Sequence, residues 1–417
     1  MSNIPKGYKQ TEVGVIPSDL EVVCLGEMTI KIGSGITPTG GVRVYKKEGR
    51  PFLRSQNVGW GRLLMDDIAF IDDTIHETFR ATEILDNDVF LNITGASIGR
   101  SAVADSRVEG GNVNQHVCII RTVNDKLNPQ FLNFILLSKV GQKQIDSFQA
   151  GGNRQGLNFG QIRSFKIPLP PTKAEQTAIA TALNDADALI TQLEKLIAKK
   201  RNIKQGAMQE LLRPKEGWEV KKLGEVATLK ARIGWHGLTT AEYKKSGDYF
   251  LVTGTEFKNG FIDWENCFYV EEERYKQDKN IQIKEHDVLV TKDGTIGKVA
   301  LIKSVPKPAT LNSGVFVIRP INNEFNPEFF YYLLLSEVFL KFLSQLSAGS
   351  TINHLYQKDF VSFQFLTTKT IEEQKKIAQI LSDMDAEIEV LEKKLEKYKM
   401  IKQGMMQNLL TGRVRLV

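Results

Sequence analysis

The sequence predicts an α+β fold built from two tandem-duplicated globular units, which are separated by two long antiparallel helices that form a coiled coil with pseudo-two-fold symmetry. Two observations predict this organisation. The segment "IKQGAMQELL", which ends at Leu212, returns almost unchanged as "IKQGMMQNLL", which ends at Leu410, 198 positions later. Apolar residues also recur at heptad spacing in the two segments that contain these repeats.

Length and composition are those of an ordinary globular protein. The 417 residues are 41% hydrophobic and 25% charged, and the net charge of +6 at pH 7 permits an acidic partner without requiring one. Three cysteines, Cys24, Cys118 and Cys267, have no paired spacing, which favours a reducing compartment. The first residues lack the apolar core of a signal peptide, and no apolar run is long enough to span a membrane. We therefore expect a cytoplasmic protein.

The duplication extends along the whole chain at one offset. From Glu175 to Leu212, 21 of 38 residues are identical to those 198 positions later. Isolated matches at the same offset lie outside this block, for example Gly99 with Gly297. Each copy therefore has a variable globular part followed by a better-matched tail. The expected bounds are 1–170 and 214–367 for the globular parts, and 171–213 and 368–417 for the helical tails.

Each globular part is predicted to be α+β. Short β-branched and aromatic runs such as "VCIIRTV" and "GVFVIRP" alternate with Gly, Asn and Asp, which is typical of strands joined by turns. One helix per unit is expected to begin after Asn128 and after Asn326. Each asparagine would cap its helix, because Pro129 or Pro327 follows it at the first helical position.

The tails are predicted to be long helices with an apolar seam. Prolines bound the first tail but are absent from its interior, and about 37 helical residues would reach roughly 55 Å at ~1.5 Å per residue. We expect the two seams to pack against each other; the alternative is that each helix docks only on its own globular part. The seam residues are Ile179, Leu183, Ile190, Leu193 and Ile197 in the first tail, and Ile377, Leu381, Met384, Ile388, Leu391 and Leu395 in the second.

No catalytic or metal-binding motif is recognised. "GASIGRS" and "DGTIGKV" resemble phosphate-binding loops, but their glycine spacing is one residue short of that pattern, so we expect tight turns between strands. The Asn-Pro stretches lack the second proline of an amino-methyltransferase motif, and helix capping explains them. The five histidines have no metal-ligand spacing, and no nucleophile lies in a recognisable elbow. We expect no enzyme activity, no cofactor and no metal.

The duplicated organisation resembles the DNA-specificity subunit of type I restriction–modification systems. The resemblance covers essentially the whole chain and is most specific in the tails, which carry "AEQTAIATALNDADALI" and "EEQKKIAQILSDMDAEI". "KARIGWHGLTTAEY", from Lys230, is similar to a recurrent opening of one class of target-recognition domain in that family. The first unit opens differently, with "KIGSGITPTGG", which implies that the two units bind different half-sites.

The resemblance implies a sequence-specific DNA-binding subunit that has no catalytic activity of its own. In that family each globular unit is a target-recognition domain that reads one half of a split, asymmetric site in double-stranded DNA. The helices bind two methyltransferase subunits, and restriction subunits join that complex. The first alternative is a coiled-coil protein-interaction scaffold without DNA specificity, and the second is an enzyme with an unrecognised site.

Polar loop residues are the candidates for DNA contact, because basic side chains bind phosphates and amides or hydroxyls read base edges. "AGGNRQGLN" matches "AGSTINHLY" at the duplication offset, and without the resemblance both would be interpreted as ordinary surface turns. The candidates are Arg54, Gln56, Asn57, Arg100, Asn153, Arg154 and Gln155 in the first unit, and Thr253, Thr255, Lys298, Thr351, Asn353 and His354 in the second.

Overall fold

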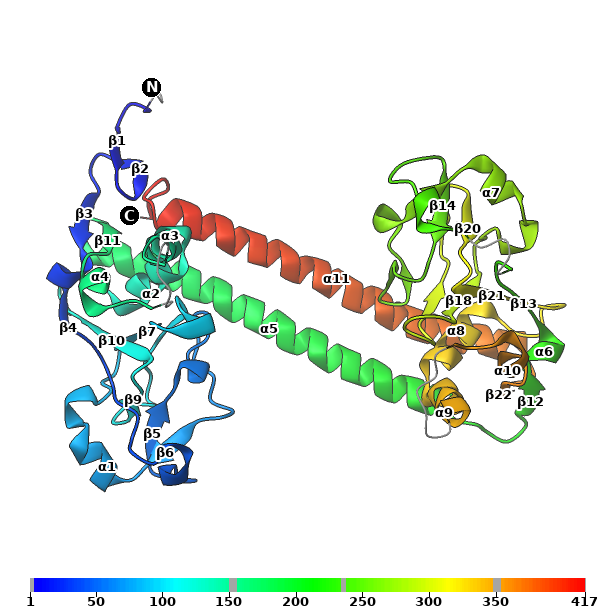
Figure 1. The fold of residues 1–417 in the computed structure, drawn as a ribbon, viewed down its shortest axis with the longest axis horizontal. Helices are drawn as coiled ribbons and strands as arrows, with labels where there is room; N and C mark the ends of the chain where they lie inside the picture. The colour runs from blue at the N-terminus through cyan, green and yellow to red at the C-terminus, as the bar shows by residue number, and fades with distance from the viewer. Residues whose placement is uncertain (1–3, 150–155, 234–237, 348–353, 417) are drawn as a thin grey trace. The chain divides into compact units, whose positions relative to one another are not determined.

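A computed structural model describes residues 4–149, 156–233, 238–347 and 354–416. The chain divides into two compact units, Met1–Glu194 with Lys393–Val417, and Lys195–Glu392. The two long helices are α5 (Lys173–Leu211) and α11 (Ile371–Leu409), and each passes from one unit into the other (Figure 1). Each unit therefore contains one globular part, the start of one long helix and the end of the other.

The first unit contains eleven strands and four shorter helices among its described residues. The strands are β1 (Tyr8–Thr11), β2 (Gly14–Pro17), β3 (Glu21–Cys24), β4 (Thr29–Ser34), β5 (Arg50–Leu53), β6 (Ala69–Ile71), β7 (Val89–Asn92), β8 (Ser101–Val103), β9 (Asn112–Val113), β10 (Val117–Thr122) and β11 (Lys166–Leu169). The helices are α1 (Asp73–Thr78), α2 (Pro129–Leu137), α3 (Lys139–Ser147) and α4 (Phe159–Arg163). A four-stranded antiparallel sheet has the order β4-β10-β7-β8, and a three-stranded sheet has the order β6-β5-β9.

The second unit repeats this topology. Its strands are β12 (Glu219–Lys222), β13 (Ala227–Lys230), β14 (Tyr249–Val252), β15 (Phe257–Lys258), β16 (Phe261–Ile262), β17 (Phe268–Val270), β18 (Val288–Thr291), β19 (Val299–Leu301), β20 (Ala309–Leu311), β21 (Val315–Pro320) and β22 (Gln364–Thr367). Its shorter helices are α6 (Leu223–Val226), α7 (Glu272–Lys276), α8 (Pro327–Leu335), α9 (Glu337–Ser347) and α10 (Gln357–Phe360). The sheet orders β13-β21-β18-β19 and β17-β14-β20 match those of the first unit strand for strand, as the duplication requires.

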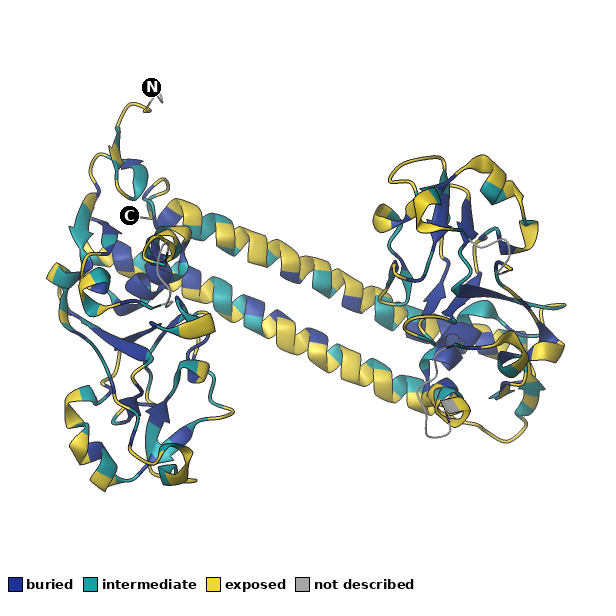
Figure 2. Ribbon diagram, viewed as in Figure 1, coloured by how far each residue is buried: buried dark blue, intermediate teal, exposed yellow. Residues whose placement is uncertain are grey.

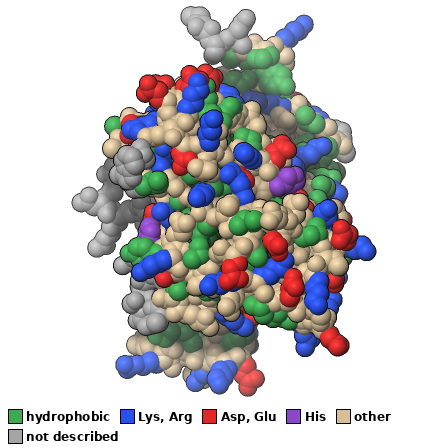
Figure 3. Space-filling view, turned by 90° about the vertical axis from the view of Figure 1, so that its right-hand side faces the viewer, with side chains coloured by type: hydrophobic (Ala, Val, Ile, Leu, Met, Phe, Trp, Pro, Cys, Tyr) green, Lys and Arg blue, Asp and Glu red, His purple; other side chains and the backbone are tan. Residues whose placement is uncertain are grey.

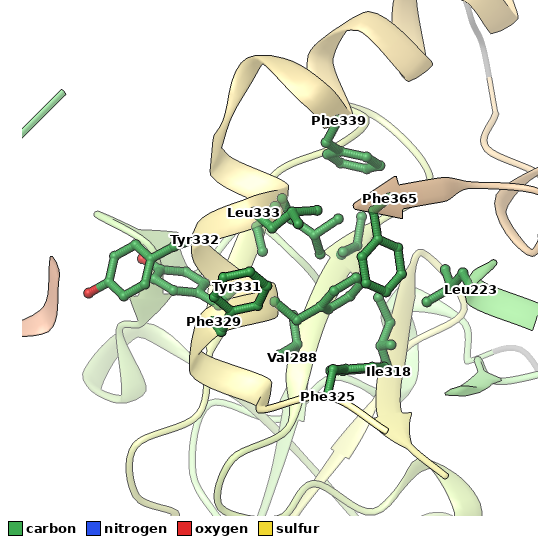
Figure 4. Packing of buried hydrophobic residues seen from close by; sticks show 14 of the residues in the cluster. Leu223, Val288, Ile318, Phe325, Phe329, Tyr331, Tyr332, Leu333, Phe339 and Phe365 are labelled. Atoms are coloured by element: carbon green, nitrogen blue, oxygen red, sulfur yellow. The ribbon is translucent and has the colours of Figure 1, made fainter. Parts of the chain in front are cut away.

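In each unit the four-stranded sheet separates two buried clusters, because successive side chains of a strand point to opposite faces. In the first unit Leu91 and Ile120 pack with helix α2, whereas Phe90 and Ile119 pack toward the three-stranded sheet. The second unit has the same arrangement. Figure 4 shows its helix-side core, in which side chains of α8 lie against the sheet and against Phe365 of β22.

The predicted asparagine caps are confirmed in both units. Asn128 Oδ1 accepts a hydrogen bond from Phe131 N at 3.0 Å, and Asn326 caps α8 in the same way. The backbone N–H of Asn128 also donates to Gln176 Oε1 at 2.9 Å, and that of Asn326 donates to Gln374 Oε1 at 2.7 Å. Both glutamine side chains are buried. The capped helix of each unit is thereby joined to the start of the long helix that follows it.

The repeated segment at the end of each long helix completes a core. Leu409 and Leu410, at the end of α11, belong to the helix-side core of the first unit. Leu212, just after the end of α5, belongs to the corresponding core of the second unit, and Leu211 packs against it. Each long helix therefore docks its start on the globular part that precedes it and its end on the core of the other unit.

The long helices run antiparallel within each unit. In the first unit Lys402 Nζ lies 2.5 Å from Asp187 Oδ1, and Lys399 Nζ lies 3.6 Å from Glu194 Oε1. Residue numbers therefore increase along α5 in the direction in which they decrease along α11. The predicted seam lies between them, while most of the remaining helix surface is exposed (Figure 2). Ile179, Leu183, Ile190, Leu193, Ile197, Ile377, Leu381, Ile388 and Leu395 are buried, and Met384 and Leu391 are half-buried.

Across the described part of the chain, no single helix is long and apolar enough to cross a membrane. The bent pair of helices Pro327–Leu335 and Glu337–Leu346 meets the requirement only when both are taken together, and only by length and composition.

Candidate nucleic-acid interface

Two loops of the first unit are joined at the end of strand β7. The buried Asn92 side chain donates from Nδ2 to Ser55 O at 2.7 Å, and the Asn92 backbone N–H donates to Arg100 O at 2.8 Å. In addition, Gly61 N–H donates to Ser101 O at 2.9 Å. The loop after β5 and the turn between β7 and β8 therefore form one surface. We define this surface, residues 54–64 and 93–101, as the first loop cluster.

The two segments that resemble phosphate-binding loops are tight turns between strands, as predicted. They join β7 to β8 and β18 to β19. Gly99 and Gly297 have φ angles of +85° and +81°, a left-handed conformation that favours glycine. A Cβ atom at Gly297 would also collide with Leu343 of α9. Backbone conformation and packing thus account for these glycines without a bound phosphate.

Arg100 and Lys298 follow those glycines at equivalent positions. Arg100 is half-buried and Lys298 is exposed. Within the described ranges, neither side chain takes part in a hydrogen bond or an ion pair. An unpaired cation beside a tight turn is available to bind a phosphate oxygen of a nucleic acid.

The structure corrects the interpretation of Asn57 as a DNA-contact residue. Asn57 is only 1% exposed. Its Oδ1 accepts from Arg54 N, and its Nδ2 donates to Leu64 O and Asp67 O, each at 3.0 Å. All these bonds lie within the loop, so the buried Asn57 amide holds the loop in shape and does not present its polar atoms to solvent.

Arg54 and Gln56 lie in the first loop cluster but share a partner there. Arg54 Nη2 donates to Asp67 O at 2.7 Å and lies 3.2 Å from the Asp67 carboxylate. The Arg54 guanidinium also lies 5.4 Å from the centroid of the Tyr45 ring. Gln56 Nε2 donates to Asp67 Oδ2. A direct contact from either side chain to DNA would therefore require exchange of the Asp67 interaction.

In the second unit Thr253 and Thr255 surround a buried carboxylate. Glu256 is 3% exposed and accepts from Thr253 N at 3.0 Å and from Gly254 N at 3.1 Å. The hydroxyls of Thr253 and Thr255 donate to Glu256 Oε1 at 2.8 and 2.7 Å. Glu256 thus has the loop-holding role that Asn57 has in the first unit, and it engages both predicted threonines.

His354 lies beside the turn that carries Lys298. Its Nδ1 is hydrogen-bonded to the carboxylate of Asp293, and its ring centroid lies 4.5 Å from that of Tyr356. Leu355 N donates to Lys292 O at 2.9 Å, which fixes the chain next to this turn. The remaining candidates, Asn153, Arg154, Gln155, Thr351 and Asn353, lie outside the described residues.

Two cysteine thiols are buried in the described part of the chain. Burial, together with the nearby charges of Glu256 and Asp263, raises the pKa of the Cys267 thiol to about 12, and burial does the same for Cys118. Both thiols are therefore protonated at neutral pH and are poor nucleophiles. Within the described ranges, no group of three or more His, Cys, Asp or Glu side chains is placed to hold a metal ion.

One face of the second unit carries charges of both signs. On the face that Figure 3 shows, basic and acidic side chains are interspersed rather than gathered by sign. A polar pocket in this unit is lined by Glu242, Lys244, Glu271, Glu273, Arg274 and Gln277. Ion pairs such as Arg274 with Glu242, at 2.6 Å, occupy its charged groups.

Three residues of these loops are not predicted from the sequence. Asn92 and Glu256 are buried polar side chains that hold the loops, and no periodic pattern distinguishes them from surface residues. Trp60, by contrast, is exposed in the segment "VGWGR". Its glycine on each side was an available signal, because paired glycines around one large residue are typical of a tight turn.

Two matches to a single family cover both units. The type I restriction modification DNA specificity domain matches residues 17–205 and again residues 215–399. The chain belongs to this family. Each match takes in one globular part and most of the long helix that follows it, so the duplication seen in the sequence is a duplication of the specificity domain.

Curated relatives in the specificity-domain family align along nearly the whole chain. The putative type I restriction enzyme MjaX specificity subunit of Methanocaldococcus jannaschii is 26% identical over 99% of this chain and 97% of its own length. The MjaVIII specificity subunit of the same organism is 27% identical over 99% of this chain and 96% of its own length. The EcoBI specificity subunit of Escherichia coli is 22% identical over 68% of this chain and 64% of its own length.

Solved structures share the fold. The S subunit of a type I restriction–modification system from M. genitalium aligns with a TM-score of 0.61 at 17% identity, over 94% of this chain and 96% of that one. A chain from a structure of a type I restriction–modification system aligns with a TM-score of 0.55 at 15% identity, over 96% of this chain and 99% of that one. The predicted fold class, α+β with two tandem units and long helices, is confirmed.

Proposed function

We propose that this chain is the sequence-specific DNA-binding subunit of a type I restriction–modification complex. Each globular part reads one half of a split, asymmetric site in double-stranded DNA. The chain recruits two methyltransferase subunits, and restriction subunits join them. The observation that carries this proposal is the double match to the specificity domain, one match for each unit.

The two units share a framework and differ in their loops, which supports two different half-sites. The strand orders of the main sheets are the same in both units. On that framework Asn57 is replaced by Glu256 as the loop-holding side chain, and Arg100 is replaced by Lys298 after the turn. We assign the target-recognition domains to residues 1–170 and 214–367, and the helical spacer to residues 171–213 and 368–417.

Within the target-recognition domains we assign phosphate contacts to Arg100 and Lys298, because their cationic groups are unpaired among the described residues. Base-edge contacts are assigned to side chains that would give up their present intramolecular partners when DNA binds. These are Arg54 and Gln56 in the first domain, and Thr253, Thr255 and His354 in the second. The remaining candidates are Asn153, Arg154, Gln155, Thr351 and Asn353. Asn57 is excluded from both sets because its amide is used within the loop.

The chain itself is proposed to be non-catalytic and to need no cofactor. The methyltransferase partners would supply the S-adenosylmethionine chemistry, and the location would be the cytoplasm, where chromosomal DNA is accessible. The partner-free chain should then show no saturable binding of S-adenosylmethionine. Saturable binding by the isolated chain would contradict this division of roles.

A scaffold without DNA specificity is less well supported. It would explain the helix pair but not the match of both globular parts to a DNA specificity domain.

Mapping of methylated bases tests the proposed function. Cells that express this chain with its methyltransferase partners should carry one bipartite, asymmetric methylated motif, and cells without the chain should carry none. In a chimera, residues 217–366 are replaced with the second domain of another family member. One half of the motif should change and the other should stay. A change in both halves would contradict independent recognition, and methylation without a motif would contradict the proposed function.

A further inference from the structure

A hairpin in the first loop cluster presents an exposed tryptophan. Trp60 is 59% exposed. The other described tryptophans are packed: the ring of Trp218 lies 6.3 Å from that of Phe329, and the ring of Trp264 lies 5.3 Å from that of Phe250. Trp60 differs from these two tryptophans, because no other aromatic ring of the described residues lies next to it.

The backbone holds this hairpin in place from both sides. Val58 pairs with Leu63 in an antiparallel bridge, and Gly59 N donates to Arg62 O at 2.9 Å. Gly61 N donates to Ser101 O at 2.9 Å, which ties the tip to the strand that follows Arg100. The indole is therefore carried on an ordered support, so that little backbone freedom would be lost when it binds a partner.

Folding explains the two glycines of this hairpin but not the tryptophan between them. Gly61 has a φ of +84°, which favours glycine. A Cβ atom at Gly59 would lie 2.9 Å from Arg62 O, closer than real Cβ contacts allow. No such requirement applies to Trp60, whose side chain points into solvent over most of its surface. Its aromatic character is therefore available for binding.

The surroundings of Trp60 favour a nucleic-acid partner. Arg62 is exposed and Arg100 is half-buried, and within the described ranges neither guanidinium has a hydrogen-bond or ion-pair partner. The bond from Gly61 to Ser101 brings both arginines to the same part of the first loop cluster. An apolar ring near unpaired cations matches duplex DNA, in which the thymine methyl groups and other base edges are exposed in grooves bordered by anionic phosphates.

The second unit has a hairpin at the corresponding place with a different turn, in which Asn259 has a φ of +52° and Gly260 a φ of +83°. Gly260 takes the place of Gly61, and its carbonyl accepts from Leu301 N at 2.9 Å. The 198-residue offset would match Trp60 to Lys258, but by its place in the turn Trp60 corresponds to Asn259, one residue later. The neighbouring Lys258 pairs with Asp263 at 3.2 Å. The frame is retained while the tip changes from apolar to polar, as expected of a residue that distinguishes two half-sites.

We propose that Trp60 is a specificity-determining residue that packs its indole against bases of the first half-site, while Arg62 and Arg100 bind neighbouring phosphates. This inference rests on the proposed function, because it assumes that the first unit binds DNA. It adds a residue, a type of contact and a half-site to that function.

The test uses the complex of the full chain with its methyltransferase subunits and a duplex that carries the motif found by methylation mapping. Dissociation constants are measured over a series of salt concentrations. Trp60→Ala should weaken binding roughly tenfold, the size of effect expected when the contact to one base pair is lost, and Trp60→Phe should retain most of the affinity. The slope of log K against log salt should not change for Trp60→Ala. For Arg62→Ala the slope should fall by about 1, because one phosphate contact is lost.

Specificity supplies the second readout. With Trp60→Ala, discrimination against duplexes altered in the first half-site should decrease, and discrimination in the second half-site should be unchanged. Leu85→Ala is the matched control, because Leu85 is also an exposed apolar residue of the first unit. It precedes the start of β7, whereas the first loop cluster adjoins Asn92 at the end of β7. This variant should bind as the wild type does.

Two results would overturn the inference alone. In the first, Trp60→Ala binds DNA as tightly and selectively as Leu85→Ala. In the second, Trp60→Ala releases the methyltransferase subunits in size-exclusion chromatography, which would make the hairpin a protein interface. If the wild-type complex itself shows no preference for the mapped motif, the proposed function fails and the inference fails with it.

Discussion

Lys402 of α11 and Asp187 of α5 form an ion pair at 2.5 Å in the first unit, and Lys204 of α5 and Asp385 of α11 form one at 2.5 Å in the second. The two pairs are equivalent in the duplication, because Asp385 lies 198 residues after Asp187 and Lys402 lies 198 residues after Lys204. Each pair joins the repeated "IKQG" segment of one helix to the first half of the other. These pairs therefore fix the register of the helices at equivalent points in both units.

The first prediction concerns the coupling between Lys402 and Asp187. Both side chains are partly exposed, so the pair should contribute roughly 1 kcal/mol to the stability of the first unit. A double-mutant cycle with Lys402→Ala and Asp187→Ala, followed by denaturant unfolding, should give a coupling energy of about that size. The charge exchange Lys402→Asp with Asp187→Lys should recover much of it. Strictly additive single effects would show that the pair does not set the register.

The equivalent pair in the second unit provides an internal comparison. Tyr332 donates from its hydroxyl to Asp385 Oδ2 at 2.8 Å, whereas the ring near Lys402 is Phe134, which has no hydroxyl. Asp385→Ala should therefore destabilise its unit more than Asp187→Ala destabilises the other, because it removes the carboxylate that accepts a hydrogen bond from the buried Tyr332 hydroxyl. The additional Tyr332→Phe substitution should remove most of that difference.

A second prediction follows from the buried thiol of Cys118. Burial raises its pKa from 9.0 to about 12, so the folded state keeps the thiol neutral while the unfolded chain ionises. The resulting stabilisation is fully present below pH 9 and is lost as the pH rises toward 12. Between pH 8.5 and 11 the wild type should lose on the order of 2–3 kcal/mol more stability than Cys118→Ala. Equal alkaline losses in denaturant titrations of the two proteins would contradict this assignment.

Local and periodic patterns made much of the fold predictable. Asparagine caps depend on two adjacent residues, and the helix seam depends on spacing, so both are visible in the sequence. The core that each long helix joins at its end was not predictable in the same way. The sequence shows that "IKQGxMQxLL" is repeated, but not that Leu410 would join the core of the first unit and Leu212 that of the second. Such long-range packing leaves no local pattern.

The loop residues show a different limit. Asn57 and Gln56 are neighbouring amides, yet one is buried and the other exposed. Side-chain direction in an irregular loop depends on a few specific hydrogen bonds, such as those from Asn57 to Leu64 and Asp67, rather than on a repeating pattern. Composition therefore shows which loops are polar and glycine-rich, but it cannot separate the side chains that hold a loop from those that face solvent.

The third prediction concerns a chain that ends at Leu212. It would lack Leu409 and Leu410, which complete the helix-side core of the first unit. It would retain its own Leu211 and Leu212, which stand at the equivalent positions of the repeat. In a symmetric dimer each copy can supply these leucines to the other, because apolar burial is worth roughly 25 cal/mol per Å².

The expected product is a two-fold dimer that reads a palindrome of the first half-site. Light scattering should give twice the chain mass at micromolar concentration, and Leu211→Asp with Leu212→Asp should give a monomer of reduced stability. A stable, monodisperse monomer of the unmodified fragment would contradict the exchange of helix ends.

The last prediction treats the long helices as a ruler between the half-sites. The boundaries between the two units fall after Glu194 in α5 and after Glu392 in α11, which are equivalent positions of the duplication. Four helix-forming residues that continue the seam should be inserted at both places. Because each insertion lies between the units, the ion pairs Lys402–Asp187 and Lys204–Asp385 keep their partners.

The paired insertion lengthens each helix by ~6 Å, and a four-residue stutter in a heptad seam is absorbed by local unwinding. DNA advances ~3.4 Å per base pair, so the unspecified spacer in the methylated motif should grow by one or two base pairs, with both half-sites unchanged. Insertion in α5 alone is the matched control, and it should weaken assembly because one of the two ion pairs must lose its register. If the doubly extended complex methylates DNA with the original spacer, the helices do not set the distance between the half-sites.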